Sequence, residues 1–547
     1  MSNFPFLTKI LEEKLICYLS SYFAKYFAKD ESTAVFLAYL FEASKMGHLC
    51  VKIDQGIHPF PSAWEAIDGL FKDELIGKVI DGANKLKLSP LPVVCMQGNL
   101  YYLQRNWFYE SQILEHFKRL NSIDSKTLFK QALLDEKLFD YSQKNLCLTE
   151  QIEAIRCAAS SSVSFILGGP GTGKTYTACH LVEALNYANP KVRIVVAAPT
   201  GKASIHLKEK IFQKSGLKVD AKTLHSLLGL RRGSSNLFKE KLLPYDVVLI
   251  DESSMIDVRV MYHLLKSIKE SSRLVMMGDP DQLPPIESGN IFYDLSSISS
   301  SSTKLEKPMR FESKHLDLFA QSLNLQKMNQ IVSILQDPKV DSIQHIAIEE
   351  NSRRFYLDLE KKIDSFFTSF SQKRNPETYL TMLNSFRLLS SIRTGYYGVD
   401  ELNKWCYEQV KLRAKSTFAV PILITSNHHV KQLYNGMVGV LVRERIAGRT
   451  EEMAYFPAED GGIKRISKIQ LPPFEYGFCL SVHKSQGSEF DHAILFMPKG
   501  SEVFGKEILY TAATRAKKSL QIIGSLDILK ETMRRSSLKL SGINDRR

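Results

Sequence analysis

Hydrophobic and polar positions follow two different patterns along this chain, and the change falls near residue 150. Up to about residue 115 the apolar positions recur at helical spacing, as in TAVFLAYLFEASKMGHL (33–49), so this part is expected to be largely helical. Within it, the segment SPLPVVCMQGNLYYLQRNW (89–107) predicts two short strands around a turn at Gly98 and Asn99. No phosphate-binding loop occurs in this first part.

From about residue 150, short β-branched runs alternate with glycine-rich or polar turns and helical patterns. Four such runs lie between 162 and 279, and PILITSN, FCLSVHK, HAILFMP and LQIIG repeat the pattern between 421 and 524. Strands that alternate with helices are typical of parallel sheets covered by helices, so the predicted fold class is α/β with two such units. A Ser-rich and then helical segment over 290–345 is expected to connect them, and the basic tail over 530–547 is expected to fray.

Composition and charge narrow the class of protein. Hydrophobic residues make up 44% of the 547 positions and charged residues 24%, which excludes a disordered or fibrous chain. The 72 Lys and Arg against 59 Asp and Glu give a net charge of +13, which fits a nucleic-acid or anionic-membrane partner but equally a merely soluble basic protein. No apolar run is long enough to span a bilayer, and Lys9, Glu12, Glu13 and Lys14 interrupt any signal peptide, so no membrane association is expected.

The eight cysteines are scattered, with no CxxC pair and no metal-ligand spacing. Such usage is typical of reduced, mostly buried thiols, and it predicts a cytoplasmic protein without structural zinc or an iron–sulfur cluster.

A phosphate-binding loop lies between the run SVSFIL and the helical pattern YTACHLVEALNYA. Its pattern G-x-x-x-x-G-K-[ST] is complete, and the predicted nucleotide-binding residues are Gly168, Gly169, Pro170, Gly171, Thr172, Gly173, Lys174 and Thr175. Glycines let successive backbone N–H groups surround phosphate oxygens at the start of a helix. Lys174 is expected to contact the β- and γ-phosphates of ATP, and the Thr175 hydroxyl to ligate Mg²⁺.

Hydrolysis needs further groups, which follow two other predicted strands. Asp251 and Glu252 come directly after the apolar run VVLI. Asp251 is predicted to hold Mg²⁺, directly or through water, and Glu252 to orient the attacking water. Gln282, in GDPDQ after the run RLVMM, is a candidate sensor of the γ-phosphate.

The ordered motifs resemble those of superfamily-one DNA helicases, most of all the RecD branch, which moves 5′ to 3′ on single-stranded DNA. They are GGPGTGKT, APTGKAS, TLHSLLG, LIDESSM, GDPDQLPP, PMRFES, VHKSQGSEF and LYTAATRAKKSL, over about 145–525. The resemblance implies two RecA-like P-loop domains with ATP and Mg²⁺ in the cleft between them. It predicts an N-terminal docking domain over 1–115, a first RecA-like domain over 116–330, and a second over 331–547 with a small β insertion at about 438–476.

The resemblance also implies roles for single residues. Gln151 is similar to the glutamine that recognises adenine, and Arg310 and Arg515 resemble arginine fingers that reach the γ-phosphate. His428 and Met437 depart from the family pattern beside the second-lobe DNA contacts. The residues that resemble DNA-holding positions are Thr200, Lys202, Thr223, His225, Asn427, Asn435, His483 and Ser485. Segment 230–243, with Phe238 near its tip, is expected to form a hairpin where the resembled branch carries a strand-separating pin.

The N-terminal part resembles the RecD domain that docks on partner subunits, so the expected assembly is a heterotrimer with RecB-like and RecC-like chains acting on single-stranded DNA and duplex DNA ends. Three alternatives stay open. The chain could be a freestanding RecD-like helicase, an ATP-binding subunit with a mainly structural role, or a nuclease in its own right. The last rests on an E-x-K pattern at 358–362, where a charged helix face is favoured.

Overall fold

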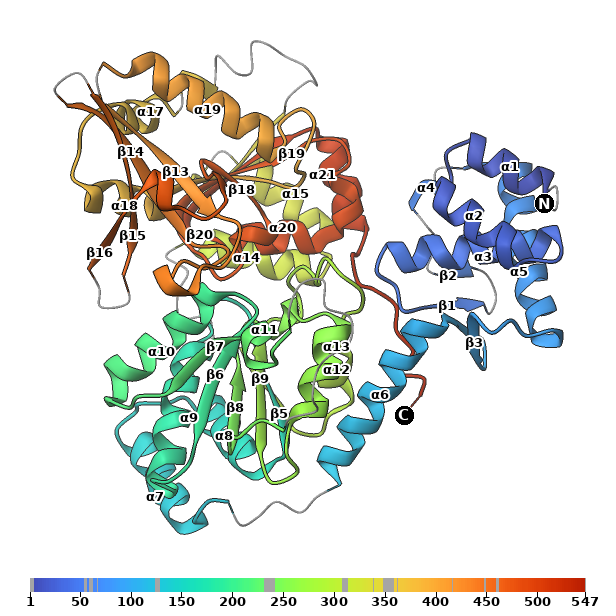
Figure 1. Cartoon of the computed structure of the whole chain (residues 1–547), viewed down its shortest axis with the longest axis horizontal. Coiled ribbons are helices and arrows are strands. Elements are labelled where there is room, and N and C mark those ends of the chain that lie inside the picture. The colour runs from blue at the N-terminus through green and yellow to red at the C-terminus, as the bar shows by residue number, and fades with distance from the viewer. Residues whose placement is uncertain are drawn as a thin grey trace.

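Two α/β lobes lie one above the other, and a smaller N-terminal domain stands beside them (Figure 1). The computed structural model describes residues 4–53, 57–58, 62–65, 67–122, 128–230, 242–306, 313–337, 339–347, 359–361, 363–415, 417–446, 449–458 and 462–546. Helix α6 (Gln104–Asn121) and the C-terminal end of the chain join the N-terminal domain to the lobes. None of the described helices is both long and apolar enough to pass through a bilayer.

The N-terminal domain is built around helix α3 (Glu31–Lys45), whose residues from Thr33 to Leu40 are all buried. Its other helices are α1 (Pro5–Glu12), α2 (Tyr18–Phe27), α4 (Ser62–Glu65) and α5 (Leu70–Leu88). The hairpin around Gly98 and Asn99 is confirmed. It belongs to an antiparallel sheet of order β2-β1-β4-β3, made of β1 (Cys50–Ile53), β2 (Ile57–His58), β3 (Val94–Gln97) and β4 (Leu100–Leu103). The prediction missed β1 and β2, because runs this short carry no clear periodicity.

The first lobe holds a six-stranded parallel sheet of order β10-β5-β9-β8-β6-β7. Its strands are β5 (Val163–Gly168), β6 (Ile194–Ala198), β7 (Asp220–Thr223), β8 (Val247–Ile250), β9 (Arg273–Gly278) and β10 (Ser302–Leu305). The helices are α7 (Gln131–Gln143), α8 (Thr149–Ser160), α9 (Lys174–Ala188), α10 (Gly201–Ser215), α11 (Leu224–Leu227), α12 (Val258–Ser267) and α13 (Ile291–Ile298). Strand β10 lies in the Ser-rich segment expected to be a connection; its polar sequence STKL is recruited as an edge strand by pairing with β5.

The second lobe holds a five-stranded parallel sheet of order β11-β20-β19-β12-β18, which together with the first lobe confirms the α/β class. Its strands are β11 (Ile343–Ile346), β12 (Phe386–Ser390), β18 (Cys479–Ser481), β19 (Phe490–Met497) and β20 (Ala516–Gly524). The helices are α14 (Lys314–Asn324), α15 (Met328–Gln336), α17 (Asp364–Ser371), α18 (Pro376–Ser385), α19 (Val399–Arg413), α20 (Gly505–Ala513) and α21 (Leu526–Arg534).

A separate antiparallel sheet of order β16-β15-β14-β13-β17 flanks the second lobe. Its strands are β13 (Thr417–Ile424), β14 (Val438–Ile446), β15 (Arg449–Pro457), β16 (Ile463–Ser467) and β17 (Phe474–Tyr476). The prediction that the run PILITSN belongs to the parallel unit is therefore wrong, since its first four residues form the second half of β13. All eight positions of β13 are buried, and a strand buried on both faces gives no periodicity that separates parallel from antiparallel pairing.

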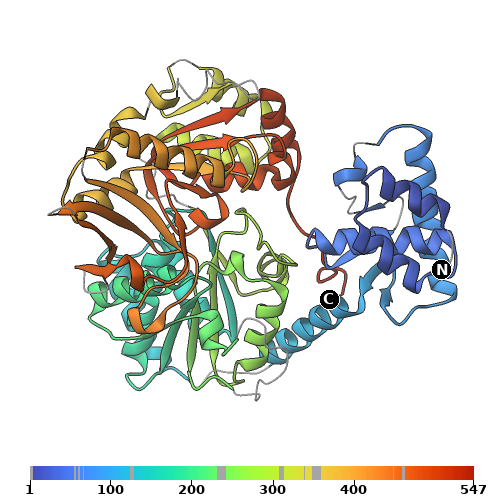
Figure 2. The ribbon, with the colours of Figure 1, turned by 45° about the horizontal axis from the view of Figure 1, so that its top comes forward.

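The C-terminal tail is bound along its length, so the expectation that it frays is wrong. From α21 it descends past the first lobe and ends beside α6 (Figures 1 and 2). Leu540 O accepts a hydrogen bond from Leu49 N at 2.8 Å, Ser541 Oγ donates to Asp294 Oδ2 at 2.8 Å, and Ile543 is fully buried. The second lobe is thereby tied to both the N-terminal domain and the first lobe.

Glu110 on α6 is the main anchor of the tail. Its side chain has no exposed area and accepts hydrogen bonds at 2.9 Å from Tyr102 Oη, Gly542 N and Arg546 Nη1. Burial raises the pKa of Glu110, while the donors from Gly542 and Arg546 act in the opposite direction. Because the pKa of Glu110 is higher in the folded than in the unfolded chain, the free energy of unfolding falls as the pH rises towards the folded-state pKa.

Arg546→Met is expected to destabilise the tail and N-terminal domain by about 3–5 kcal/mol, because it leaves the buried Glu110 carboxylate without its cation. The loss should be larger at alkaline than at mildly acidic pH, where Glu110 can protonate. Urea unfolding followed by tryptophan fluorescence measures this, since Trp107 lies 5.8 Å from the Arg546 guanidinium. The double variant Glu110→Gln, Arg546→Met should recover part of the loss; a double variant as unstable as the sum of both singles contradicts the pairing.

Candidate active site

The phosphate-binding loop lies between β5 and α9, as its pattern requires. Gly171 and Gly173 have φ of 79° and 89°, a backbone conformation that favours glycine. A Cβ atom on Gly173 would lie 2.6 Å from Gln151 Nε2, and one on Gly169 would lie 2.9 Å from Tyr510 Oη. Gly169 and Gly173 are therefore also needed because a side chain at either position would collide with its neighbour. Through Tyr510, the second lobe lies directly against the loop.

Lys174 is held inside this loop. Its ammonium donates to Gly168 O at 2.5 Å and Gly169 O at 3.0 Å, and Thr172 Oγ1 also donates to Gly169 O, at 2.8 Å. The ammonium therefore stands at the positive end of α9, where backbone N–H groups and the helix dipole favour phosphate oxygens.

Gln151, which resembles the adenine-recognising glutamine, is buried and hydrogen-bonded within its own lobe. The side chain is 2% exposed, and its Oε1 accepts a hydrogen bond from Leu148 N at 3.0 Å, which caps α8. Its amide nitrogen faces Gly173. The residue thus lies beside the phosphate loop, and its contact with adenine stays a prediction.

The two carboxylates follow β8 at the same edge of the sheet. Asp251 Oδ1 accepts a hydrogen bond from Glu252 N at 2.9 Å, and Glu252 has a φ of 51°, a strained value for a residue with a side chain. Burial, followed by the negative charge of Glu252, raises the pKa of Asp251, whereas the charge of Lys174 lowers it. A Cβ on Gly487 would lie 3.5 Å from Glu252 Oε1, so a loop of the second lobe reaches this carboxylate too.

Gln282 is buried in a small polar network at the end of β9. Its Nε2 donates to Asp279 Oδ2 at 3.0 Å, and Tyr510 Oη donates to the same oxygen at 3.1 Å. Gln282 Oε1 is buried without a hydrogen-bond partner in the described part of the chain. Through Asp279, this predicted sensor is linked to Tyr510, which the sequence analysis missed although it lies in the motif LYTAATR.

A cavity of about 310 Å³ lies between the two lobes at the phosphate loop. Gly169, Pro170 and Thr172 line it from the first lobe, and Asn324, Tyr510 and Thr514 from the second. Asp281 lies in the same wall, and burial together with Asp279 raises its pKa to about 6. The nucleotide site is therefore assembled from both lobes.

Arg515 lies at this interface but does not line the cavity. Its guanidinium is 3% exposed and donates to Thr511 O at 3.1 Å, Ser488 O at 3.3 Å and Thr514 Oγ1 at 3.2 Å. Ser488 belongs to the same loop as Gly487, which lies against Glu252. The arginine is thus bonded to neutral groups, in the part of the second lobe that lies against Glu252. Arg310 and the hairpin around Phe238 lie outside the described residues and stay predictions.

The residues proposed for magnesium suit that ion. Thr175 supplies a hydroxyl in the first turn of α9, and Asp251 supplies a carboxylate whose negative charge is disfavoured by burial and by Glu252. Magnesium prefers oxygen ligands and is held by one or two carboxylates together with substrate phosphates. A bound cation would offset the unfavourable charge on Asp251.

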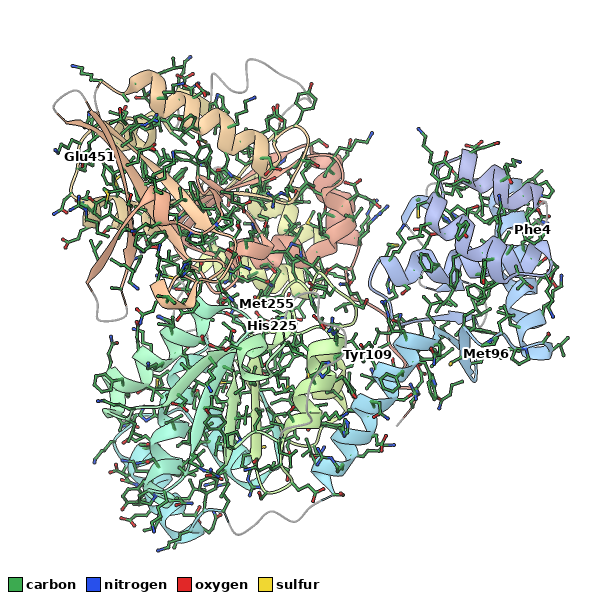
Figure 3. All side chains as sticks on the ribbon, in the orientation of Figure 1. Phe4, Met96, Tyr109, His225, Met255 and Glu451 are labelled. Atoms are coloured by element: carbon green, nitrogen blue, oxygen red, sulfur yellow. The ribbon has the colours of Figure 1, made fainter. Side chains whose placement is uncertain are left out.

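Four predicted DNA contacts lie at the top of the first lobe, which faces the second. Thr200 and Thr223 cap α10 and α11 through their hydroxyls, and Thr223 is buried. His225 is exposed and lies near the boundary between the lobes (Figure 3). Lys202 Nζ crosses that boundary and donates to Ser488 Oγ at 2.8 Å.

The other four lie in the second lobe, in two different settings. Asn427 and Asn435 are exposed, and Asn427 Oδ1 accepts a hydrogen bond from Asn435 N at 2.8 Å. Ser485 is fully buried and donates to Val482 O at 2.7 Å. His483 packs edge-on against Phe504, and burial, with a smaller effect of Lys539, lowers its pKa to about 4. DNA contact by these residues stays a prediction.

His428 and Met437, which depart from the family pattern, and Glu360 of the E-x-K pattern each contact a neighbouring residue. His428 Nδ1 accepts a hydrogen bond from Lys431 N at 3.3 Å, and Met437 Sδ accepts one from Tyr434 N at 3.3 Å, so both shape the same loop. Glu360 of the E-x-K pattern pairs with Arg413 at 2.5 Å, which fits the charged-face interpretation. Lys361 of the same pattern is exposed, whereas Asp358 and Lys362 lie outside the described residues.

Comparisons with known proteins agree with this architecture. An AAA domain matches residues 151–288, and a UvrD-like helicase C-terminal domain matches residues 476–523. The RecBCD enzyme subunit RecD of Buchnera aphidicola (subsp. Schizaphis graminum) is 26% identical over 96% of this chain and 98% of its own, and that of Mycolicibacterium smegmatis is 28% identical over 94% of each.

Two further similarities are to proteins that are named as helicases. The ATP-dependent RecD2 DNA helicase of Deinococcus radiodurans is 25% identical over 69% of this chain and 49% of its own. A solved structure of Pif1 helicase from Candida albicans aligns with a TM-score of 0.43 at 16% identity, over 73% of this chain and 97% of its own. The full-length likeness to RecD subunits confirms the resemblance predicted from the order of the motifs.

Proposed function

We propose that this chain, similar to RecD subunits over nearly its whole length, is an ATP-driven 5′-to-3′ DNA helicase and the motor subunit of a RecBCD-like helicase–nuclease that acts on double-strand DNA ends. One observation carries the motor function: the phosphate loop and Glu252 of the first lobe are touched by Tyr510 and Gly487 of the second. A nucleotide site shared by two lobes couples ATP binding and hydrolysis to the distance between them.

The residues divide the chemistry among them. Lys174 and the N-terminus of α9 bind the phosphates, Glu252 orients the attacking water, and Arg515 offsets charge on the γ-phosphoryl group in the transition state. Magnesium, held by Thr175 and Asp251 with the nucleotide, would neutralise the phosphate oxygens. Lys202 and Ser488 join a predicted DNA-binding motif of the first lobe to the loop that Arg515 contacts.

Docking on RecB-like and RecC-like chains is supported by an exposed aromatic stripe on the N-terminal domain. Tyr18, Tyr22 and Tyr26 recur every four residues on α2 and are 83%, 64% and 73% exposed. Such a spacing places them on one helix face, and tyrosine is enriched where proteins bind each other. The proposal includes a cytoplasmic location, which the eight free cysteines support.

The direction of unwinding tests the motor function. Unwinding is measured on duplexes that carry either a 5′ or a 3′ single-stranded tail. A 5′-to-3′ motor is expected to open only the duplex with the 5′ tail. ATP hydrolysis should rise on addition of single-stranded DNA. Hydrolysis without unwinding of either substrate would favour a mainly structural ATP-binding subunit. Magnesium-dependent digestion of DNA by the pure chain that survives Glu252→Gln would place a nuclease in this chain.

Partner docking is tested by replacing the stripe. The triple variant Tyr18→Ser, Tyr22→Ser, Tyr26→Ser is expected to lower co-purification with RecB-like and RecC-like chains at least tenfold, since it removes three exposed aromatic anchors. A matched variant, Phe139→Ser, Phe212→Ser, Tyr396→Ser, removes three exposed aromatics elsewhere. Equal losses for the two variants, or none for the first, would argue against this docking face.

A further inference from the structure

A second cavity, of about 260 Å³, opens where helix α10 of the first lobe meets α18 and the antiparallel sheet of the second. It shares no lining residue with the nucleotide cavity. Lys202, Arg387 and Lys464 line it from three different elements, and none of the roles assigned above uses Arg387 or Lys464.

Arg387 is the unusual residue of this cavity. Its side chain is 2% exposed, and its guanidinium donates to Gly477 O at 2.6 Å and Leu383 O at 2.7 Å. Its Nε atom is buried without a hydrogen-bond partner, and no carboxylate pairs with it, in the part of the chain that is described. Burial lowers the pKa of Arg387 to about 10. A buried guanidinium without an acid is costly, and an anion bound from outside would relieve that cost.

The two lysines of the cavity also have neutral partners. Lys202 Nζ donates to Ser488 Oγ at 2.8 Å, and Lys464 Nζ donates to Lys431 O and to Gln432 Oε1, both at 2.9 Å. Burial, and next the positive charge of Arg387, lowers the pKa of Lys202 to about 8. Among the described residues that line the cavity, one carboxylate is found, that of Glu209. Three cations against one anion leave an excess of positive charge.

Part of the remaining wall is apolar, beside polar residues such as Asn384 and Gln432. Leu383, Met437, Leu480 and Phe490 line the cavity, and the Arg387 guanidinium stacks 5.1 Å from the centre of the Phe490 ring. An anionic site beside an aromatic and apolar wall fits a nucleotide, which carries a phosphate and a flat base. The volume is near the lower end of small-molecule pockets, roughly 300 Å³, and suits one nucleotide unit.

We propose that this cavity holds one nucleotide of the bound single strand, with its phosphate toward Lys464, Arg387 and Lys202 and its base against Met437 and Phe490. The proposal rests on the proposed DNA helicase function and adds a binding site to it. The site lies where the two lobes and the antiparallel sheet meet, so relative movement of the lobes would change its shape. A nucleotide held there would therefore be gripped and released as ATP is bound and hydrolysed.

A matched pair of charge variants tests the phosphate contact. Lys464→Gln removes a cation that lines the cavity, whereas Arg465→Gln removes the exposed cation next to it on β16. We expect Lys464→Gln to weaken binding of oligothymidine several-fold and to reduce the slope of log K against log salt by about 0.7, the value for one phosphate contact on a single strand. Arg465→Gln should change the slope by much less. Equal changes in the two variants would overturn the proposal.

Photo-crosslinking tests the position of the base. An oligothymidine that carries one 5-iodouracil should crosslink to a peptide containing Met437 or Phe490, as mapped by mass spectrometry. Free thymidine monophosphate in excess should not prevent this; if it does, the site binds free nucleotides and the proposal is wrong. Binding of the oligonucleotide with crosslinks only elsewhere would refute this site alone, whereas failure of the unmodified chain to bind it would refute the helicase function.

Discussion

Arg515→Ala is expected to lower the DNA-stimulated rate of ATP hydrolysis by about 10³–10⁵-fold while ATP binding is retained. The guanidinium is buried at the lobe interface and bonded to Ser488 O and Thr511 O, so no carboxylate in the described part holds its charge. Closure of the lobes can therefore direct that charge to the γ-phosphoryl group. Steady-state hydrolysis at saturating DNA and a fluorescent-nucleotide binding assay measure the two effects.

Lys517→Ala is the matched control for Arg515. Lys517 lies two residues further along β20 and pairs with Glu489 at 3.4 Å on the surface, so its loss should leave turnover within about twofold of the parental rate. An Arg515→Ala enzyme that retains more than about a tenth of the parental rate would contradict the finger role. Loss of nucleotide binding as well would indicate that Arg515 mainly supports the interface.

Lys174→Gln is expected to abolish DNA-stimulated ATP hydrolysis, to less than about a tenth of the parental rate, while single-stranded DNA still binds. The Lys174 ammonium donates hydrogen bonds to Gly168 O and Gly169 O, and a glutamine amide can donate to the same carbonyl groups. The substitution thus removes the positive charge beside the γ-phosphate and leaves the loop in place. Hydrolysis and fluorescence anisotropy with labelled oligonucleotides check the two halves of this prediction.

The control for this variant is Lys191→Gln, which removes one exposed lysine from the same lobe and should change neither measurement. If Lys174→Gln also lost DNA binding, the phosphate loop and the DNA-binding surface would be coupled even without nucleotide. If it kept normal turnover, the loop would not be the catalytic phosphate site.

Ser488 links the predicted DNA-binding residue Lys202 to the predicted arginine finger Arg515. Its hydroxyl accepts a hydrogen bond from Lys202 of the first lobe, and its carbonyl oxygen accepts one from Arg515. The motif VHKSQGSEF predicted DNA contacts at His483 and Ser485, yet Ser485 is fully buried, whereas Ser488 spans the interface. Sequence reasoning singled out this loop for DNA contacts, which stay a prediction, and missed the residue that joins the lobes.

The sequence by itself determined the local parts of this protein. The glycines around Lys174, and Asp251 and Glu252 directly after a buried strand, depend on neighbours within a few residues, so their chemistry could be inferred from the pattern. The parallel sheets likewise follow from short buried runs that alternate with helices. The hairpin at Gly98 was predictable for the same reason, since a turn is a local structure.

Only the tertiary structure decided the contacts between distant segments. The partner of Arg546 is Glu110, 436 residues away, and burial of that pair turns a tail expected to fray into a strap across two domains. Strand β13 joins an antiparallel sheet because of what lies beside it, although its own residues are apolar throughout. Arg387 acquires its significance because no acid pairs with it among the described residues. Periodicity records which positions are buried, but electrostatics and pairing depend on which other groups are buried with them.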